Sequence, residues 1–155
     1  MTSNEKITLL ISAIAAGIAA LSLLISILGY FLNRRSNKAA LLHQVKTSID
    51  DAKTLMENRT VEMAPLSSKK KRTADEERQL DTLKSVYESS LEKVINAYED
   101  GCQKYCANLI LKKEFKKSYF GDIRDYVEQF EDKFTGPVTR YTYILRLYRE
   151  WHKPS

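Results

Sequence analysis

The feature that most constrains this chain is an uncharged, apolar run near its N-terminus. Between Ile7 and Leu32 there is no Asp, Glu, Lys or Arg. As a helix, these about 26 residues would measure ~39 Å, against ~30 Å for the hydrocarbon core of a bilayer. A signal peptide has a shorter apolar region, followed by small residues, whereas two aromatic residues and then Arg34 come near the end of this run. The run therefore predicts one transmembrane helix, and residues 1–33 are assigned as the anchor.

Charges on either side of the run predict its orientation. Arg34, Arg35 and Lys38 follow it, whereas Lys6 before it is offset by Glu5. Lysine and arginine accumulate on the cytoplasmic side of membrane helices. The sequence therefore predicts a single-pass protein of the cell inner membrane with its C-terminal part in the cytoplasm.

Beyond the anchor, the apolar residues have the spacing of a helix. They recur at three- and four-residue intervals from Leu42 to Met56, and no later window alternates well enough to predict a strand. The pattern fades at Glu57, and the polar, basic segment 65–72 is expected to be an exposed loop. Residues 34–72 are therefore assigned as a stalk helix, continuing from the anchor, and a basic loop.

A second helix is expected to begin after Thr73. Glu76 stands three residues later, which is the spacing of a capping box. The apolar stripe that follows reaches Leu109, and Gly101 interrupts it. We expect a helix of about 30 residues with a kink at this glycine.

Two more helices complete the prediction. One is expected over 115–134, ended by Gly136 and Pro137, and another over 141–151. Glycine and proline are scarce, at 5 and 3 residues, which favours long helices over many short strands. The predicted fold is all-α: an N-terminal single transmembrane helix followed by a small helical-bundle cytosolic domain of about four helices. Residues 73–155 are assigned as the helical cytosolic domain.

No motif for catalysis or metal binding is found. The glycines are isolated, so no glycine-rich phosphate loop exists, and neither His43 nor His152 has the preceding glutamate of a helical di-iron site. Cys102 and Cys106 share a helix face, where geometry does not readily let them bond, and free thiols suit a reducing cytoplasm. We expect both to be small core residues, and predict a non-enzyme with no catalytic residue, metal or cofactor.

Three features predict a homo-oligomer. Small residues recur at four-residue spacing in the anchor, at Ser12, Ala16 and Ala20, and such stripes let membrane helices approach closely. The stalk has a heptad-like stripe. The chain also has nine tyrosines, and its cytosolic domain is too small to bury every aromatic ring alone.

Lysine and arginine outnumber aspartate and glutamate by 25 to 20, and much of the excess is clustered. One cluster, 69–72, lies in the expected loop, and a second begins the third helix at 112–117. Each has three interpretations: a solvated face, attraction to anionic lipid headgroups, or a site for phosphates.

The predicted ligand-binding residues lie at the end of the chain. Arg146, Arg149 and Lys153 share one side of the last helix. The opposite, apolar side is expected to contain Tyr141, Ile144, Tyr148 and Trp151. Arginine makes bidentate contacts with phosphate, and aromatic rings nearby can stack on bases. Arg140 and His152 complete the set. The alternative is structural pairing of these cations with acids such as Glu150, Asp122 and Asp125.

The layout of the chain resembles that of the small membrane-anchored effectors of type III CRISPR defence. The features that match are the span at 7–32, the compact basic domain and the arginine-rich end at 140–153. The resemblance covers layout only and includes no diagnostic motif. It implies an oligomeric cytosolic domain that binds the signalling nucleotide cyclic oligoadenylate and acts on the membrane in antiviral defence.

The sequence therefore supports two functions. The first is this nucleotide-binding effector, with membrane lipid, further copies of itself and a cyclic oligonucleotide as partners, and no duplex nucleic acid. The alternative is an inner-membrane docking or scaffold module that binds a protein partner.

Overall fold

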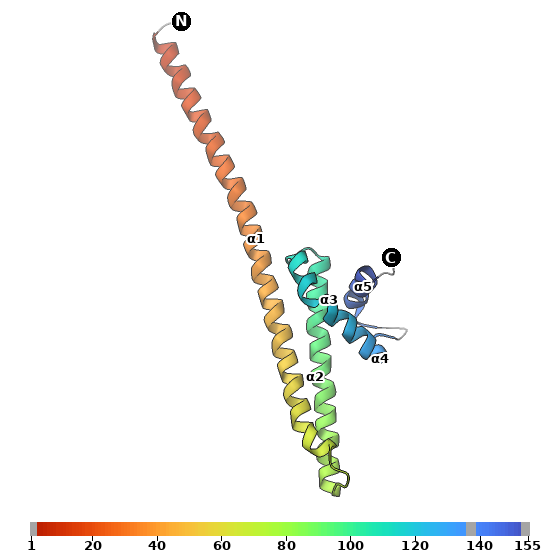
Figure 1. The fold of residues 1–155 in the computed structure, drawn as a ribbon. Helices are drawn as coiled ribbons and strands as arrows, with labels where there is room; N and C mark the ends of the chain where they lie inside the picture. Colours follow the sequence, from red (N-terminus) through yellow and green to blue (C-terminus); the bar gives the residue numbers. More distant parts are fainter. Residues whose placement is uncertain (1–2, 136–138, 153–155) are drawn as a thin grey trace. The chain divides into compact units, whose positions relative to one another are not determined.

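The protein is all-helical in the part that its structure describes. This computed structural model describes residues 3–135 and 139–152, with only the backbone given for 3 and 5–13. Five helices and no strand are found there (Figure 1). The predicted all-α class is confirmed. The expected helix end at Gly136 and Pro137, and Lys153 of the predicted site, lie outside the described residues.

The chain divides into two compact units, Met1–Lys38 and Ala39–Ser155. The first helix, α1, runs from Ser3 to Ser67 and contributes to both. In the first unit α1 is long and apolar enough to cross a membrane, with a mean hydropathy of 2.2 over its most apolar window. A core helix of a soluble protein can pass the same test, but none of the side chains in that window is buried.

Two serines of this apolar segment, Ser22 and Ser26, have their hydroxyl groups hydrogen-bonded within the helix. The Ser22 hydroxyl donates to the Ile18 carbonyl at 2.9 Å, and the Ser26 hydroxyl to that of Ser22 at 2.8 Å. In hydrocarbon no water can pair with such groups, so internal pairing lowers the cost of placing them there. The serines are therefore compatible with an apolar surrounding.

The loop predicted at 65–72 begins later than expected, because α1 continues through Pro65 to Ser67, and residues 68–73 form the turn before the next helix. Proline cannot donate the usual helical hydrogen bond, but here it lies in the last turn, where little helix remains to be disturbed. The last carbonyls are paired by Arg72, whose Nε donates to Leu66 at 2.6 Å and whose Nη2 donates to Ser67 at 2.8 Å. One of the four basic residues of 69–72 thus ends the helix.

The start of the second helix was predicted correctly. Helix α2 spans Ala74–Cys106 and follows a complete capping box. The Glu76 N–H donates to the Thr73 hydroxyl at 3.3 Å, and the Thr73 N–H donates to the Glu76 carboxylate at 3.0 Å. Glu76 also pairs with Lys69 across the turn. Local chemistry is sufficient to fix this boundary.

Gly101 serves close packing, since α2 continues past it to Cys106. A Cβ atom at this position would lie 2.9 Å from both the Phe115 ring and a Val45 methyl group. Any larger residue would have to displace a packed ring and a short, rigid side chain. The glycine therefore lets the stalk part of α1, from Ala39, and the third helix approach α2 together (Figure 1).

The predicted third helix is divided in two. Helix α3 spans Lys112–Gln129 and α4 spans Glu131–Phe134, with Phe130 between them at φ −119° and ψ 46°. Because the chain turns there, Phe134 is buried against Tyr141, and Lys133 reaches Glu88 of α2 at 3.0 Å. Tertiary contacts thus outweigh the helical pattern of the segment.

The last helix, α5, spans Thr142–Trp151 and completes the core of the second unit. That core is rich in aromatic rings, and several pack with their rings tilted or edge to face. Its largest completely buried side chains, drawn from all three long helices and α5, include Ile49, Tyr98, Phe115, Ile123, Ile144 and Leu147. The predicted small helical bundle is confirmed at this level.

Candidate functional site

The N-terminus of α5 is held by a carboxylate from another helix. The Tyr143 N–H donates to Glu99 Oε1, and the Ile144 N–H to Glu99 Oε2, both at 2.9 Å. The side chain of the N-cap residue, Tyr141, makes no capping hydrogen bond. The free N–H groups of a helix start attract anions, so an internal carboxylate occupies the place where a phosphate would otherwise bind.

The buried face of α5 differs slightly from the predicted one. Ile144 and Trp151 are buried as expected, and so is Leu147, which the prediction omitted. Leu145 and Tyr148 are only partly buried. The spacing of three and four residues through Ile144, Leu147 and Trp151 was itself a readable signal for the true core face.

Arg140 is engaged with the rest of the domain. Its Nη2 lies 3.2 Å from Glu92 Oε2 of α2, and its Nε donates to the Tyr141 hydroxyl at 3.2 Å. The side chain is 63% exposed, so the ion pair is a surface one. Arg140 is thus paired with an acid of its own chain, as expected if the predicted site residues serve structure and not ligand binding.

Arg146 and Arg149 are exposed, and within the described ranges neither makes an ion pair or a hydrogen bond. Two of the acids considered as their partners are engaged elsewhere: Asp122 binds Lys53, and Asp125 binds Arg124. Both arginines are therefore available to an external anion.

These two arginines open onto different depressions. Arg146 lines a pocket of about 280 Å³ together with Gln103, Cys106, Ala107 and Tyr143. Arg149 lines another of about 430 Å³ between α3, α4 and α5. The structure does not bring them together into one phosphate site within the chain.

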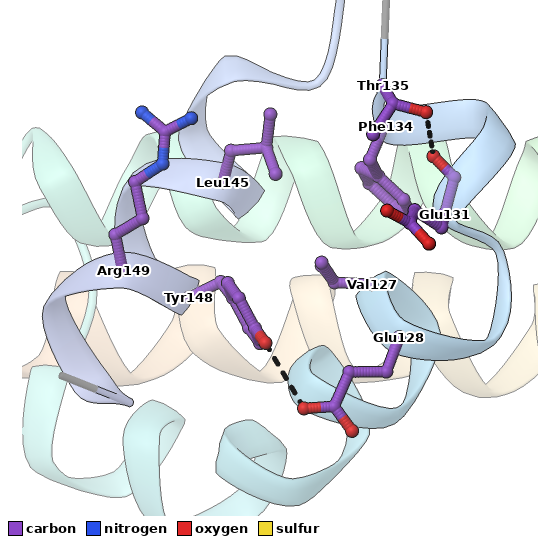
Figure 2. Close-up of a pocket in the computed structure, with 8 residues that line it drawn as sticks. All are labelled: Val127, Glu128, Glu131, Phe134, Thr135, Leu145, Tyr148 and Arg149. Carbon is purple, nitrogen blue, oxygen red and sulfur yellow. Dashed lines mark hydrogen bonds between the residues drawn. The ribbon is translucent and has the colours of Figure 1, made fainter. Parts of the chain in front are cut away.

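The larger pocket has an apolar floor, where Val127 and Phe134 are buried, and an acidic rim of two exposed glutamates. Val127, Phe134 and Leu145 supply apolar surface, and Glu128 and Glu131 supply two carboxylates. Arg149 is the single cation among the lining residues, and Figure 2 shows its guanidinium pointing away from both carboxylates. With two negative charges and one positive charge, the lining has a formal charge of −1. The pocket therefore favours a cationic group over a phosphate.

One carboxylate of the rim is held in place. The Tyr148 hydroxyl donates to Glu128 Oε1 at 3.1 Å, drawn as a dashed line in Figure 2. This hydrogen bond to an anion raises the pKa of Tyr148, so the tyrosine stays a donor at physiological pH. The oriented acceptor leaves the second oxygen of Glu128 for another donor.

His152 is packed against rings of its own chain. Its ring centroid lies 4.3 Å from that of Phe120 and 5.1 Å from that of Tyr148. Its Nδ1 lies 3.1 Å from the Tyr148 carbonyl, and its buried Nε2 has no hydrogen-bond partner among the described residues. His152, one of the rings expected to stack on bases, is thus engaged with other rings of its own chain.

The two cysteines lack the features of reactive thiols. Cys102 is completely buried, and burial raises its pKa well above the usual range. Burial also raises the pKa of Cys106, despite the opposing charge of Arg146. Both therefore remain protonated at neutral pH, when only the thiolate is a good nucleophile or metal ligand. No group of three potential metal ligands is found in the ranges that the structure covers.

The acidic rim was not foreseen from the sequence. Glu128 and Glu131 lie on α3 and α4, and they meet Leu145 and Arg149 only because the chain turns at Phe130. No local signal marks such a meeting, since the residues are more than a dozen positions apart.

Comparison with protein families, characterised proteins and solved structures finds nothing that matches this chain. The resemblance in layout to CRISPR effectors therefore stays a prediction.

Proposed function

We propose that the chain is a membrane-anchored docking module, and that the pocket between α3, α4 and α5 receives a basic side chain of a protein partner. The observation that carries this proposal is the combination of an apolar floor with two carboxylates at the rim. A lysine or arginine side chain has the matching form, with an aliphatic stem and a charged head. A polyanion entering the same pocket would meet Glu128 and Glu131 first.

The anchor in this proposal is the apolar segment 7–32, which crosses the inner membrane and leaves the helical domain in the cytoplasm. Arg34 and Arg35, directly after the segment, support this orientation. Alkaline phosphatase fused after Ser155 should be inactive, because that enzyme needs the oxidising periplasm. A cytoplasmic reporter at the same position should be active. Phosphatase activity would reverse the orientation.

Docking can be tested by titration of a defined probe. The full-length chain, held in neutral-lipid nanodiscs, is titrated with a labelled amphipathic peptide of about twelve lysine and leucine residues. Replacing Glu128 and Glu131 together by glutamine should weaken binding about ten-fold or more, because charged hydrogen bonds of ~1.5–3 kcal/mol are lost. Glutamine keeps the size of the side chain and the acceptor for Tyr148.

The matched control is Arg146→Ala, an exposed cation on the same helix that opens onto the other pocket. It should leave peptide binding unchanged, whereas Arg149→Ala should leave it unchanged or strengthen it, since a like charge is removed from the rim. Equal binding by the wild type and the glutamine variant would contradict docking at this pocket.

The second candidate is the nucleotide-binding effector, favoured by the two arginines without an internal partner. Because they open onto different pockets, this function requires neighbouring copies to bring their arginines to a shared axis. Labelled cyclic tetraadenylate, added to the same proteins, should then bind, and Arg146→Ala and Arg149→Ala should each weaken it about ten-fold or more. Light scattering of a monomer, or no binding by the wild type, would remove this candidate.

A further inference from the structure

The charges of α3 are separated along its length. Lys112, Lys113, Lys116 and Lys117 occupy the first two turns and are all exposed, with Glu114 as the single acid among them. Asp122, Asp125 and Glu128 follow in the later turns, together with one cation, Arg124. A helix carries a partial positive charge at its N-terminus and a negative one at its C-terminus, so both groups are placed against the helix dipole. The acids have partners of their own, since Asp122 pairs with Lys53, Asp125 with Arg124 and Glu128 with Tyr148. The lysines at the start of the helix gain nothing from the dipole, and their clustering needs another explanation.

Two exposed apolar residues accompany these lysines. Leu109 is 49% exposed in the loop before α3, and Phe120 is 36% exposed on the helix itself. The Lys116 ammonium lies 5.8 Å from the Phe120 ring centroid and 5.4 Å from that of Trp151. We call the four lysines with Leu109 and Phe120 the α3 basic patch. A surface of cations around apolar tips is the composition that binds at a lipid interface.

The α3 basic patch lies on a helix that packs near the start of the stalk, and the stalk follows the anchor directly in sequence. Phe115, between its lysines, packs at Gly101 together with Val45 of α1. Val45 is only thirteen residues after Leu32, where the apolar segment ends. Few residues therefore separate the anchor from this part of the domain along the chain. Between Leu32 and Asp50 the chain has several lysines and arginines and no acid.

We propose that the α3 basic patch binds the anionic phospholipid headgroups of the membrane in which the chain is anchored. The proposal rests on the anchor of the proposed function but not on the docking pocket. Lysines near an anionic membrane surface are attracted to it, and the attraction adds up over neighbouring residues. Leu109 and Phe120 can enter the boundary between headgroups and acyl chains. This contact also accounts for cations placed against the dipole of α3, because the lipid phosphates neutralise them.

Trp151, the single tryptophan of the chain, is a built-in reporter at the α3 basic patch. The full-length chain is placed in nanodiscs of phosphatidylcholine alone or with about a quarter phosphatidylglycerol, both with the same small fraction of headgroup-spin-labelled lipid. Trp151 fluorescence should be quenched more in the anionic discs. Salt at ~0.5 M should return it to the neutral level, because the Debye length falls to a few ångströms.

Charge reversal at Lys113 and Lys117 is the decisive variant, since neither makes the ring contacts of Lys112 and Lys116. Losing two attractions weakens contact with the anionic surface about thirty-fold, and the two repulsions added by charge reversal should weaken it further, which returns the quenching to the neutral level. The matched control reverses Lys70 and Lys71, which are exposed in the turn between α1 and α2. It changes the net charge equally and should keep the quenching of the wild type.

Equal quenching of the wild type in neutral and anionic discs would overturn the proposal, and so would equal loss in both variants. The salt dependence of the wild type keeps the test decisive if a variant fails to fold. Failure of the anchor is a separate result, because the chain would then not enter the nanodiscs at all. Failure of docking would appear only in the peptide titration.

Discussion

Replacing Glu99 by alanine is expected to destabilise the domain by about 3–5 kcal/mol and to release α5 from α2. Its two carboxylate oxygens accept the N–H groups of Tyr143 and Ile144 at 2.9 Å each. Hydrogen bonds to a charged group contribute ~1.5–3 kcal/mol each, and the N-cap residue Tyr141 makes no capping hydrogen bond with its own side chain. Thermal unfolding of the full-length chain in detergent, followed by circular dichroism, measures the effect.

The matched control is Glu92→Ala, which removes another glutamate of α2, two turns earlier in the helix. Glu92 pairs with Arg140 at 3.2 Å, and that arginine is 63% exposed. Exposed ion pairs contribute ~0–1 kcal/mol, so this variant should remain near the wild type. Limited proteolysis should cut the segment after Thr135 faster only in Glu99→Ala. Equal effects of the two alanine variants would contradict the capping role of Glu99.

The function of Glu99 illustrates what the sequence could not predict. The capping box of Thr73 and Glu76 was readable because its two partners are three residues apart. Glu99 caps a helix whose first N–H groups are 44 and 45 positions later. Spacing along a helix indicates which residues share a face, but not which distant segment that face meets.

The positions where helices begin and end also depend partly on local sequence and partly on tertiary contacts. The apolar stripes predicted the presence of every long helix, and the core positions Val45, Tyr98 and Phe115 lie on those stripes. The two errors, the helical ending at Ser67 and the break at Phe130, depend on contacts with Arg72 and Glu88. Such contacts come from the turn after α1 and from a neighbouring helix, and they override the local preference.

For the candidate site, the sequence predicted only that its arginine side chains would be exposed. Arg146 and Arg149 are on the solvent side of α5, as their spacing indicated. That they open onto separate pockets, and that the pocket of Arg149 is acidic, depends on how α5 packs between other helices. The helical period predicts which residues share one face of a helix, whereas the pocket of Arg149 is formed by three helices.

A polar cluster inside the domain joins the three long helices and is the second place where a large effect is expected. Asp122 Oδ2 of α3 accepts from Lys53 of α1 and from the buried Tyr98 hydroxyl of α2, both at 2.6 Å. Burial raises the pKa of Tyr98, and raises those of Tyr119 and Tyr126 to about 12. The three tyrosines are therefore neutral at physiological pH, and Asp122 and Lys53 carry the charges of the cluster.

Asp122→Ala is expected to destabilise the domain by about 2–3 kcal/mol at neutral pH. The buried Tyr98 hydroxyl would lose its acceptor, and the half-buried Lys53 its counter-charge. The neighbouring control, Asp125→Ala, removes an exposed pair with Arg124 and should cost ~0–1 kcal/mol. Thermal unfolding of both variants gives the comparison. A loss in Asp125→Ala as large as that in Asp122→Ala would contradict this account.

The cluster also predicts how stability depends on pH. Burial alone would raise the pKa of Asp122, but hydrogen bonds from Lys53 and Tyr98 outweigh it, so the pKa is lowered on folding. A carboxyl whose pKa is lower in the folded state stabilises that state above its unfolded pKa of ~3.9. Its contribution is lost as the pH falls through the folded value. The wild type should therefore lose stability below about pH 4 more steeply than Asp122→Asn, which has no proton to bind at this position. Parallel curves of unfolding free energy against pH for the two proteins would show that the cluster does not hold Asp122 in its charged form.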